Sequence, residues 1–193
     1  RAVGEEYTLA IATDLVCTHK KGPVTVNLST SRMNNDIAAK HGRELFRSKV
    51  GEINVSTLMQ ENGSAIGGEG NGGVILPDLH YGRDAIVSVA LVLQWMAESD
   101  KSIEDFVAST PAYVMCKQKI DRPDGSIQEI YDSLAEKFKE QNVDTQDGIW
   151  IDYGNAWVHV RASNTEPILR LMSEAPTLAE AEILCKNISD AMG

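Results

Sequence analysis

Residues 157–172 have the sequence WVHVRASNTEPILRLM, in which two apolar runs flank the polar segment 161–167. The apolar runs favour two strands, so the polar segment is predicted to be a loop at a strand end. Pro167 fixes its own φ and pushes Glu166 towards an extended conformation, which stiffens the exit from this loop. The stretch therefore predicts a sheet with a concentration of polar groups at one strand end.

This loop brings together hydrogen-bonding groups from four side chains, those of Arg161, Ser163, Asn164 and Thr165. A guanidinium offers a planar fork that fits a phosphate group bidentately. Hydroxyl groups and the backbone N–H groups of a turn can complete an anion-binding nest. We interpret the loop as a phosphate-binding site. An ordinary polar turn is the alternative, because Ser, Asn and Pro are common turn residues.

The surrounding residues predict an α+β domain at 111–193. Ser126 and Thr177 each stand three residues before a Glu and directly before an apolar helical pattern, which is the signature of a capping box. Strand-like runs occur at 113–120, 148–152, 156–161 and 168–173. This order of strand, helix, three strands and helix predicts two helices on one face of an antiparallel sheet.

The residues before this domain alternate between helical and strand patterns, which is typical of α/β architecture. Apolar spacing predicts helices at 5–18, 29–41, 52–61 and 84–97, and strands at 24–28, 45–46 and 65–66. The helix at 84–97 is apolar nearly all round, so we expect it to be buried. Residues 109–111 have the composition of a linker, which places the domain boundary near residue 110.

A second polar loop follows the predicted strand at 65–66, where residues 67–73 have the sequence GGEGNGG. Its glycines allow the backbone to approach a ligand closely and to adopt positive φ. The carboxylate of Glu69 can accept hydrogen bonds from two vicinal hydroxyls, and the amide of Asn71 can both donate and accept. We predict a sugar-binding loop. A flexible linker is the alternative, although linkers seldom separate a buried strand from a buried helix.

Lys49 is a third candidate, because it lies between a predicted strand and a predicted helix. An ammonium group at such a junction could meet a phosphate or a sugar oxygen. A solvated surface lysine is the alternative.

The chain has 193 residues and a net charge of −10, from 28 acidic and 18 basic residues. This balance repels a nucleic-acid backbone and an anionic membrane, so we expect neither as a partner. Cys17, Cys116 and Cys185 are odd in number and form no C-x-x-C pair, which argues against a disulfide framework and a zinc knuckle. The expected compartment is the cytoplasm. Because a helical pattern begins directly after Arg1, we expect the chain to be the later part of a longer polypeptide.

Taken together, these segments resemble those of the α-D-phosphohexomutase family over essentially the whole chain. Residues 68–73 (GEGNGG) are similar to the family's sugar-binding loop G-E-x-S-G-H. Residues 161–167 (RASNTEP) are similar to its phosphate-binding loop R-x-S-x-T-E-P. Residues 49–52 (KVGE) resemble the turn that carries a lysine in the family's third domain. Each motif alone is modest, but the three in this order and spacing are specific.

The resemblance implies a phosphohexomutase-type three-layer α/β domain at 21–110 and a TATA-binding-protein-like α+β domain at 111–193. Residues 1–20 would be the helical tail of a preceding domain. Family members carry a phosphorylated serine and an aspartate-rich magnesium loop in their first two domains, and neither motif occurs in this sequence. The chain alone is therefore expected to be inactive, without catalytic residues or metal ligands of its own, and to need those N-terminal domains as partners.

The activity that the resemblance implies is reversible transfer of a phosphoryl group between the 1- and 6-positions of a hexose phosphate. The complete enzyme would use Mg²⁺ and a hexose 1,6-bisphosphate activator. A non-catalytic sugar-phosphate-binding module is the alternative. The residues that would bind the phosphate group that is not reacting are Arg161, Ser163, Asn164 and Thr165. The residues that would bind the sugar or neutralise charge at its reacting end are Glu69, Gly70, Asn71 and Lys49.

The sequence departs from the family's sugar loop at two positions, since Asn71 and Gly73 stand where Ser and His are common. Either change could alter the hexose preference, or another group such as His80 could fill the missing role. For His80, a loop histidine that caps the next helix is the alternative. Glu52 stands where some relatives carry His, which favours glucosamine phosphate over glucose and mannose phosphates.

Overall fold

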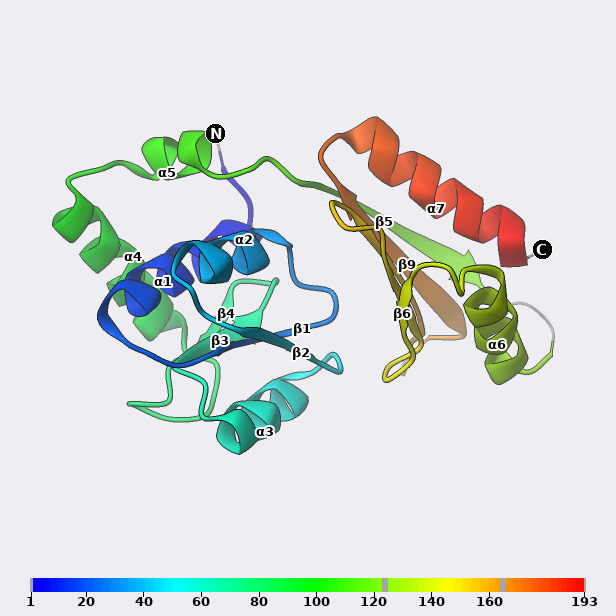
Figure 1. The fold of residues 1–193 in the computed structure, drawn as a ribbon, viewed down its shortest axis with the longest axis horizontal. Coiled ribbons are helices and arrows are strands. Elements are labelled where there is room, and N and C mark those ends of the chain that lie inside the picture. The colour runs from blue at the N-terminus through cyan, green and yellow to red at the C-terminus, as the bar shows by residue number, and fades with distance from the viewer. Residues whose placement is uncertain (1, 123–124, 164–165, 193) are drawn as a thin grey trace. The chain divides into compact units, whose positions relative to one another are not determined.

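The structure is a computed structural model that describes residues 2–122, 125–163 and 166–192. The chain divides into two compact units, one ending at Pro111 and the other beginning at Ala112. Each unit has its own sheet and its own helices (Figure 1).

The first unit is a three-layer α/β domain. Its four-stranded sheet has the order β2-β1-β3-β4, in which β1 is parallel to β2 and β3, and β4 is antiparallel at the edge. Helix α3 packs on one face of the sheet and α1 on the other (Figure 1). The predicted α/β class is confirmed. The strands are β1 (Val24–Asn27), β2 (Leu45–Ser48), β3 (Ile66–Glu69) and β4 (Gly73–Ile75). The helices are α1 (Glu6–His19), α2 (Met33–Lys40), α3 (Glu52–Asn62), α4 (Ala85–Ser99) and α5 (Ile103–Ser109).

Strand β3 is formed by the first half of the glycine-rich segment. A Cβ atom on Gly67 would lie 2.4 Å from the carbonyl oxygen of Thr25, and one on Gly68 would lie 2.1 Å from the carbonyl oxygen of Gly73. Neighbouring backbone therefore comes closer than a side chain permits. The sequence predicts a strand at 65–66 and a loop from residue 67, whereas the strand continues to Glu69 because these glycines serve close packing within the sheet.

Helix α1 is an integral part of the first unit. Its buried residues include Leu9, Ile11 and Leu15, and it packs against α2, α4 and β3. The sequence assigns residues 1–20 to the tail of a preceding domain. In the structure this helix instead forms the layer over β3, because its apolar side chains need cover from the sheet and from two neighbouring helices.

Helix α4 is far more exposed than its sequence predicts. Its buried residues are Ser88, Leu91 and Trp95. Ile86 and Leu93 on another side of the helix are 82% and 59% exposed. The prediction of a buried helix is wrong for this chain. The apolar composition of a helix does not show how many of its sides are covered by other elements of the fold.

The second unit is an α+β domain. Its five-stranded sheet has the order β5-β9-β8-β7-β6, and every neighbouring pair is antiparallel. Leu134 of α6 and Ile188 of α7 belong to the same core cluster as Ile151 and Leu171 of the sheet, so both helices pack on one face (Figure 1). The predicted α+β class is confirmed. The strands are β5 (Val114–Asp121), β6 (Asn142–Asp144), β7 (Ile149–Asp152), β8 (Trp157–Ala162) and β9 (Ile168–Ala175). The helices are α6 (Ile127–Lys137) and α7 (Leu178–Met192).

Two local details of this unit differ from the sequence prediction. Strand β6 is additional, because a three-residue run with one apolar side chain shows no alternation. The capping box at Thr177 is formed, since its Oγ1 accepts a hydrogen bond from the N–H of Glu180 at 3.3 Å and Oε2 of Glu180 accepts one from the N–H of Thr177 at 3.0 Å. The predicted box at Ser126 is not formed, because its side chain makes no capping hydrogen bond.

A buried carboxylate, that of Asp14, joins α1 to α2 and α4. It accepts hydrogen bonds from Nε1 of Trp95 at 2.8 Å and from Nζ of Lys40 at 3.0 Å, and Nε2 of His41 lies 2.7 Å away. Burial opposes ionisation of this carboxyl group. The three partners outweigh burial and hold the pKa of Asp14 below its ordinary value of 3.8.

We expect Asp14→Asn to lower the free energy of unfolding by about 1–3 kcal/mol near pH 7, because the donors around Asp14 lose their charged acceptor. Since the folded-state pKa is the lower one, the stabilisation is present above about pH 4 and is lost as the pH falls through the folded-state value. Urea unfolding at several pH values measures both effects. Asp78→Asn is the control, because the Asp78 side chain is 60% exposed. An Asp14→Asn variant with the acid sensitivity of the wild type would contradict this prediction.

The exposure of α4 gives a second prediction. We expect Leu91→Ala to lower the free energy of unfolding by about 2–4 kcal/mol, because Leu91 is buried. Leu93→Ala removes the same atoms from a side chain that is 59% exposed, so the expected change is below about 0.5 kcal/mol. Thermal and urea unfolding of the 193-residue chain measure both variants. Equal losses would show that the outer side of α4 is covered in solution.

Candidate functional site

The carboxyl ends of three parallel strands meet at one edge of the first sheet. Asn27 ends β1, Ser48 ends β2 and Glu69 ends β3, and Asn27 is opposite Ser48 in the strand register. In open α/β sheets, the loops that follow such strand ends form the ligand crevice. Lys49 directly follows the end of β2, and the predicted sugar loop includes the end of β3, so both lie at this edge.

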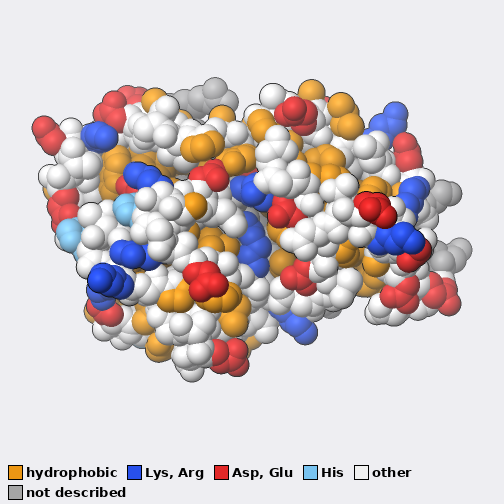
Figure 2. All heavy atoms as spheres, viewed as in Figure 1, with side chains coloured by type: hydrophobic (Ala, Val, Ile, Leu, Met, Phe, Trp, Pro, Cys, Tyr) orange, Lys and Arg blue, Asp and Glu red, His pale blue; other side chains and the backbone are white. Residues whose placement is uncertain are grey.

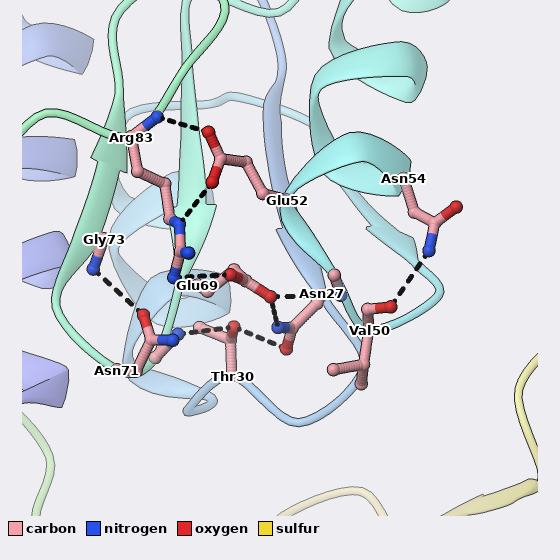
Figure 3. Close-up of polar contacts among 11 residues, drawn as sticks. Asn27, Thr30, Val50, Glu52, Asn54, Glu69, Asn71, Gly73 and Arg83 are labelled. Carbon is pink, nitrogen blue, oxygen red and sulfur yellow. Dashed lines mark hydrogen bonds and ion pairs between the residues drawn. The ribbon is translucent and has the colours of Figure 1, made fainter. Parts of the chain in front are cut away.

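Glu69 is the central group of this edge (Figure 3). It is only 5% exposed. Its Oε1 accepts hydrogen bonds from Nδ2 of Asn27 at 2.8 Å and from the N–H of Gly51 at 3.1 Å, and its Oε2 lies 3.0 Å from Nη1 of Arg83. A buried carboxylate is tolerated only with such partners. Glu69 therefore fixes three connections around β3: the end of β1, the turn before α3 and the segment before α4.

A second set of hydrogen bonds holds the start of the predicted sugar loop. Oγ1 of Thr30 donates to Oδ1 of Asn27 at 3.0 Å and accepts from the N–H of Gly70 at 3.1 Å. The N–H of Ser29 donates to the same Oδ1 at 2.9 Å. The loop after β1, through Thr30, therefore holds Gly70 in place.

An open cavity of about 430 Å³ lies beside the sugar loop, and its wall includes Asn71, Gly73 and Arg83. Oδ1 of Asn71 accepts a hydrogen bond from the N–H of Gly73 at 3.2 Å, which fixes the turn. The wall includes neither the buried Glu69 nor Lys49. Lys49 is exposed, and its ammonium group makes no hydrogen bond or ion pair with the described residues. Of the predicted sugar-binding side chains, the structure thus places that of Asn71 at the cavity.

Glu52 and Arg83 form an ion pair at this site that no pattern in the sequence predicts. Oε1 of Glu52 accepts a hydrogen bond from the N–H of Arg83 at 2.9 Å, and its Oε2 accepts one from Nε at 2.8 Å. The backbone and side-chain hydrogen bonds from Arg83 lower the pKa of Glu52, and the hydrogen bond to Glu52 raises the pKa of Arg83. The one feature of the sequence that could have indicated this pair is Gly73, because its missing side chain leaves space for another group.

His80 supports the start of α4. Its Nε2 lies 3.1 Å from Oδ2 of Asp84, and its Nδ1 accepts a hydrogen bond from the N–H of Gly82 at 3.1 Å. Asp84 is the N-cap residue of α4, because its Oδ1 accepts hydrogen bonds from the N–H groups of Ile86 and Val87. His80 does not line the cavity.

The predicted phosphate loop follows β8 in the second unit. Arg161 lies near the end of this strand, with its Nε 3.4 Å from Oδ2 of Asp147. The N–H of Ser163 donates to the carbonyl oxygen of Ile168 at 2.9 Å, so the two ends of the loop are joined. Two of the predicted phosphate-binding residues lie outside the described residues, namely Asn164 and Thr165.

Three basic side chains, which we call the basic row, cross the second sheet beside this loop. Lys119 of β5 is opposite Arg170 of β9, and Arg170 is opposite Arg161 of β8. Opposite residues of antiparallel strands share a face, and Leu169, the neighbour of Arg170, belongs to the core on the other face. Glu166 of the loop pairs with Lys119 at 3.1 Å and with Arg170 at 3.5 Å. Basic and acidic side chains are interspersed on the face of the molecule drawn in Figure 2.

Two further side chains fix the strand that carries Arg161. The N–H of Ala162 donates to the phenol oxygen of Tyr131 at 2.8 Å, and burial raises the pKa of Tyr131. Nε2 of His159 lies 2.7 Å from the carbonyl oxygen of Asp147, and burial lowers the pKa of His159 to about 4. His159 is therefore neutral at pH 7, and it holds the segment whose carboxylate faces Arg161.

The described residues contain no group of three or more His, Cys, Asp and Glu side chains that could hold a metal ion. No helix in the described ranges combines the length and the apolar character needed to span a membrane.

Comparisons with known proteins agree with this architecture. The model of the phosphoglucomutase/phosphomannomutase alpha/beta/alpha domain III matches residues 4–113, and the model of the C-terminal domain matches residues 115–191. The first match includes α1, which supports its place in the first unit. A solved phosphoglucomutase/phosphomannomutase family protein from Burkholderia thailandensis has the same fold, with a TM-score of 0.79 at 20% identity over 99% of this chain and 42% of that chain.

Curated relatives are similar in sequence over nearly the whole chain. A phosphoglucomutase/phosphomannomutase from Thermococcus kodakarensis is 37% identical over 94% of this chain and 40% of its own length. A probable phosphoglucosamine mutase from Methanopyrus kandleri is 32% identical over 91% of this chain and 40% of its own length. The chain thus spans about 40% of the length of these relatives. It belongs to the phosphoglucomutase/phosphomannomutase family, of which it carries the third domain and the C-terminal domain.

Proposed function

We propose that the chain is the substrate-binding C-terminal part of a phosphohexomutase, which interconverts hexose 1-phosphate and hexose 6-phosphate. The observation that supports this most is the basic row beside residues 161–167. Three basic side chains are gathered there in a chain whose net charge is −10. Like charges directly opposite each other destabilise a sheet. Glu166 and Asp147 offset part of this repulsion. A phosphate group is a further anionic partner for the row, since arginine and lysine side chains bind phosphate groups through charge-assisted hydrogen bonds.

In this proposal each unit binds one part of the substrate. The second unit binds the phosphate group that is not reacting, through Arg161, Ser163, Asn164 and Thr165. The first unit binds the sugar at the edge formed by the ends of β1, β2 and β3. Its sugar-binding residues are Gly70 and Asn71, with Glu69 as the group that organises the loop and Lys49 as a positive charge near the reacting end.

The proposed reaction consists of two phosphoryl transfers. A phosphoserine outside this chain gives its phosphoryl group to the free hydroxyl of the sugar phosphate, and a hexose 1,6-bisphosphate forms. The bisphosphate reverses its orientation, and its other phosphoryl group returns to the serine. Mg²⁺ is the proposed cofactor of the complete enzyme. The contribution of this chain is to position the substrate, which is a large part of catalysis in phosphoryl transfer.

An assay of the polypeptide that carries this chain at its natural length tests the proposal. With Mg²⁺ and a hexose 1,6-bisphosphate, we expect turnover of glucosamine 1-phosphate, glucose 1-phosphate or mannose 1-phosphate, and the order of kcat/KM identifies the substrate class. The 193-residue chain alone is expected to be inactive. Turnover by this chain alone would contradict its role as a part of the enzyme. Binding without turnover by the natural-length polypeptide would favour a non-catalytic sugar-phosphate-binding module.

A substitution of Arg161 tests the phosphate loop. Arg161→Lys keeps the positive charge and removes the planar fork, so we expect KM for the hexose phosphate to rise about ten-fold with a smaller change in kcat. Lys139→Ala is the control in the same unit, because the Lys139 side chain is 61% exposed. Circular dichroism shows whether each variant is folded. An unchanged KM in a folded Arg161→Lys enzyme would leave residues 161–167 as an ordinary polar turn.

A further inference from the structure

The side chain of Arg83 fills the space beside Gly73 in the first unit. A Cβ atom on Gly73 would lie 2.3 Å from Cδ and 3.0 Å from Cγ of Arg83. Gly73 is not among the glycines with positive φ, so its backbone conformation alone would accept a side chain. Arg83 therefore occupies the part of the sugar loop in which a side chain at residue 73 would otherwise stand.

Two carboxylates hold Arg83 in this position (Figure 3). Its Nε donates to Oε2 of Glu52 at 2.8 Å, and its Nη1 lies 3.0 Å from Oε2 of Glu69. Its backbone N–H donates to Oε1 of Glu52 at 2.9 Å. Since the main chain and both sides of the guanidinium are held, the side chain has one defined orientation.

The guanidinium still has donors to offer a ligand. It carries five N–H donors, and the contacts with Glu52 and Glu69 involve its Nε and Nη1. Its Nη2 has no acceptor within the described ranges of the chain. The Arg83 side chain is 38% exposed and lines the open cavity of about 430 Å³. These donors are therefore available at the cavity.

The chemistry around the cavity matches hydroxyl groups better than a phosphate group. Arg83 supplies donors, while the carboxylate of Glu52 and the amide oxygen of Asn71 supply acceptors. Each hydroxyl of a vicinal pair both donates and accepts, so it can use both kinds of partner. A phosphate group has acceptor oxygens only and would meet the negative charges of Glu52 and Asp84, which also line the cavity.

We propose that Arg83 is a substrate-binding residue that determines specificity, because its N–H donors select the orientation of vicinal hydroxyl groups on the hexose. Glu69 is then a positioning residue, which acts by orienting Arg83. This inference rests on the proposed function, since it takes a hexose phosphate as the ligand.

The test compares substrates that differ in one hydroxyl orientation. In the natural-length polypeptide, kcat and KM are measured for glucose 1-phosphate and mannose 1-phosphate, whose C2 hydroxyls point in opposite directions. For Arg83→Lys we expect KM for the preferred sugar to rise about ten-fold, and the ratio of kcat/KM between the two sugars to move towards one. Arg43→Lys is the matched control, because Arg43 donates to the carbonyl oxygen of Cys17 and does not line the cavity.

A double substitution tests whether Arg83 and Gly73 share one space. Gly73→Ala should displace the side chain of Arg83 and raise KM as Arg83→Ala does. The variant with both substitutions should lose no more than Arg83→Ala alone, because the guanidinium that the added methyl group would displace is already absent. Thermal unfolding shows that each variant is folded. Independent losses that multiply in the double variant would overturn the shared-space argument.

The outcomes separate this inference from the proposed function. If the wild-type polypeptide turns over none of the hexose phosphates, the proposed function is wrong and the role of Arg83 fails with it. If the wild type is active and a folded Arg83→Lys enzyme keeps its KM and its preference between the two sugars, the proposed function stands and the role of Arg83 is overturned.

Discussion

The ion-paired, hydrogen-bonded carboxylate of Glu69 is the constraint on which the site of the first unit depends. A carboxylate that is 5% exposed must be surrounded by donors, or folding would leave an uncompensated charge. The donors come from Asn27, Gly51 and Arg83, which belong to three different connections. One side chain thereby connects three separate loops at one edge of the sheet, and one of its partners, Arg83, lines the cavity beside them.

The glycines around Glu69 belong to the same argument. Gly67 and Gly68 let β3 lie against the backbone of its neighbours, with distances that exclude a Cβ atom. Gly73 leaves space that the side chain of Arg83 fills. A glycine-rich sequence is usually interpreted as freedom of the backbone. Here Gly67, Gly68 and Gly73 are required because atoms of other residues occupy the positions of their missing side chains.

Patterns of the sequence predict the fold well wherever burial on one face sets a period. The strands around residues 161–167 and the helices α6 and α7 are examples, because each alternates or repeats along a continuous run. The prediction fails for α4, since a helix with apolar side chains all round gives no signal of which sides have neighbours. It also misses Arg83, which lies ten residues beyond Gly73 in the printed sequence and whose position depends on packing between loops. The basic row is missed for a similar reason, because Lys119 lies opposite Arg170 only through the register of β5 and β9.

Most cations at the two candidate sites are already paired with carboxylates: Arg83 with Glu52 and Glu69, Arg161 with Asp147, and Lys119 and Arg170 with Glu166. These pairs remove much of the long-range attraction that free cations would exert on an anion, which fits a chain whose net charge is −10. They also fix the orientation of each guanidinium before a ligand arrives. A ligand then loses less free energy to ordering the side chains that bind it. Selectivity at such sites comes from the fixed directions of the remaining donors, and therefore from the shape of the ligand more than from its charge.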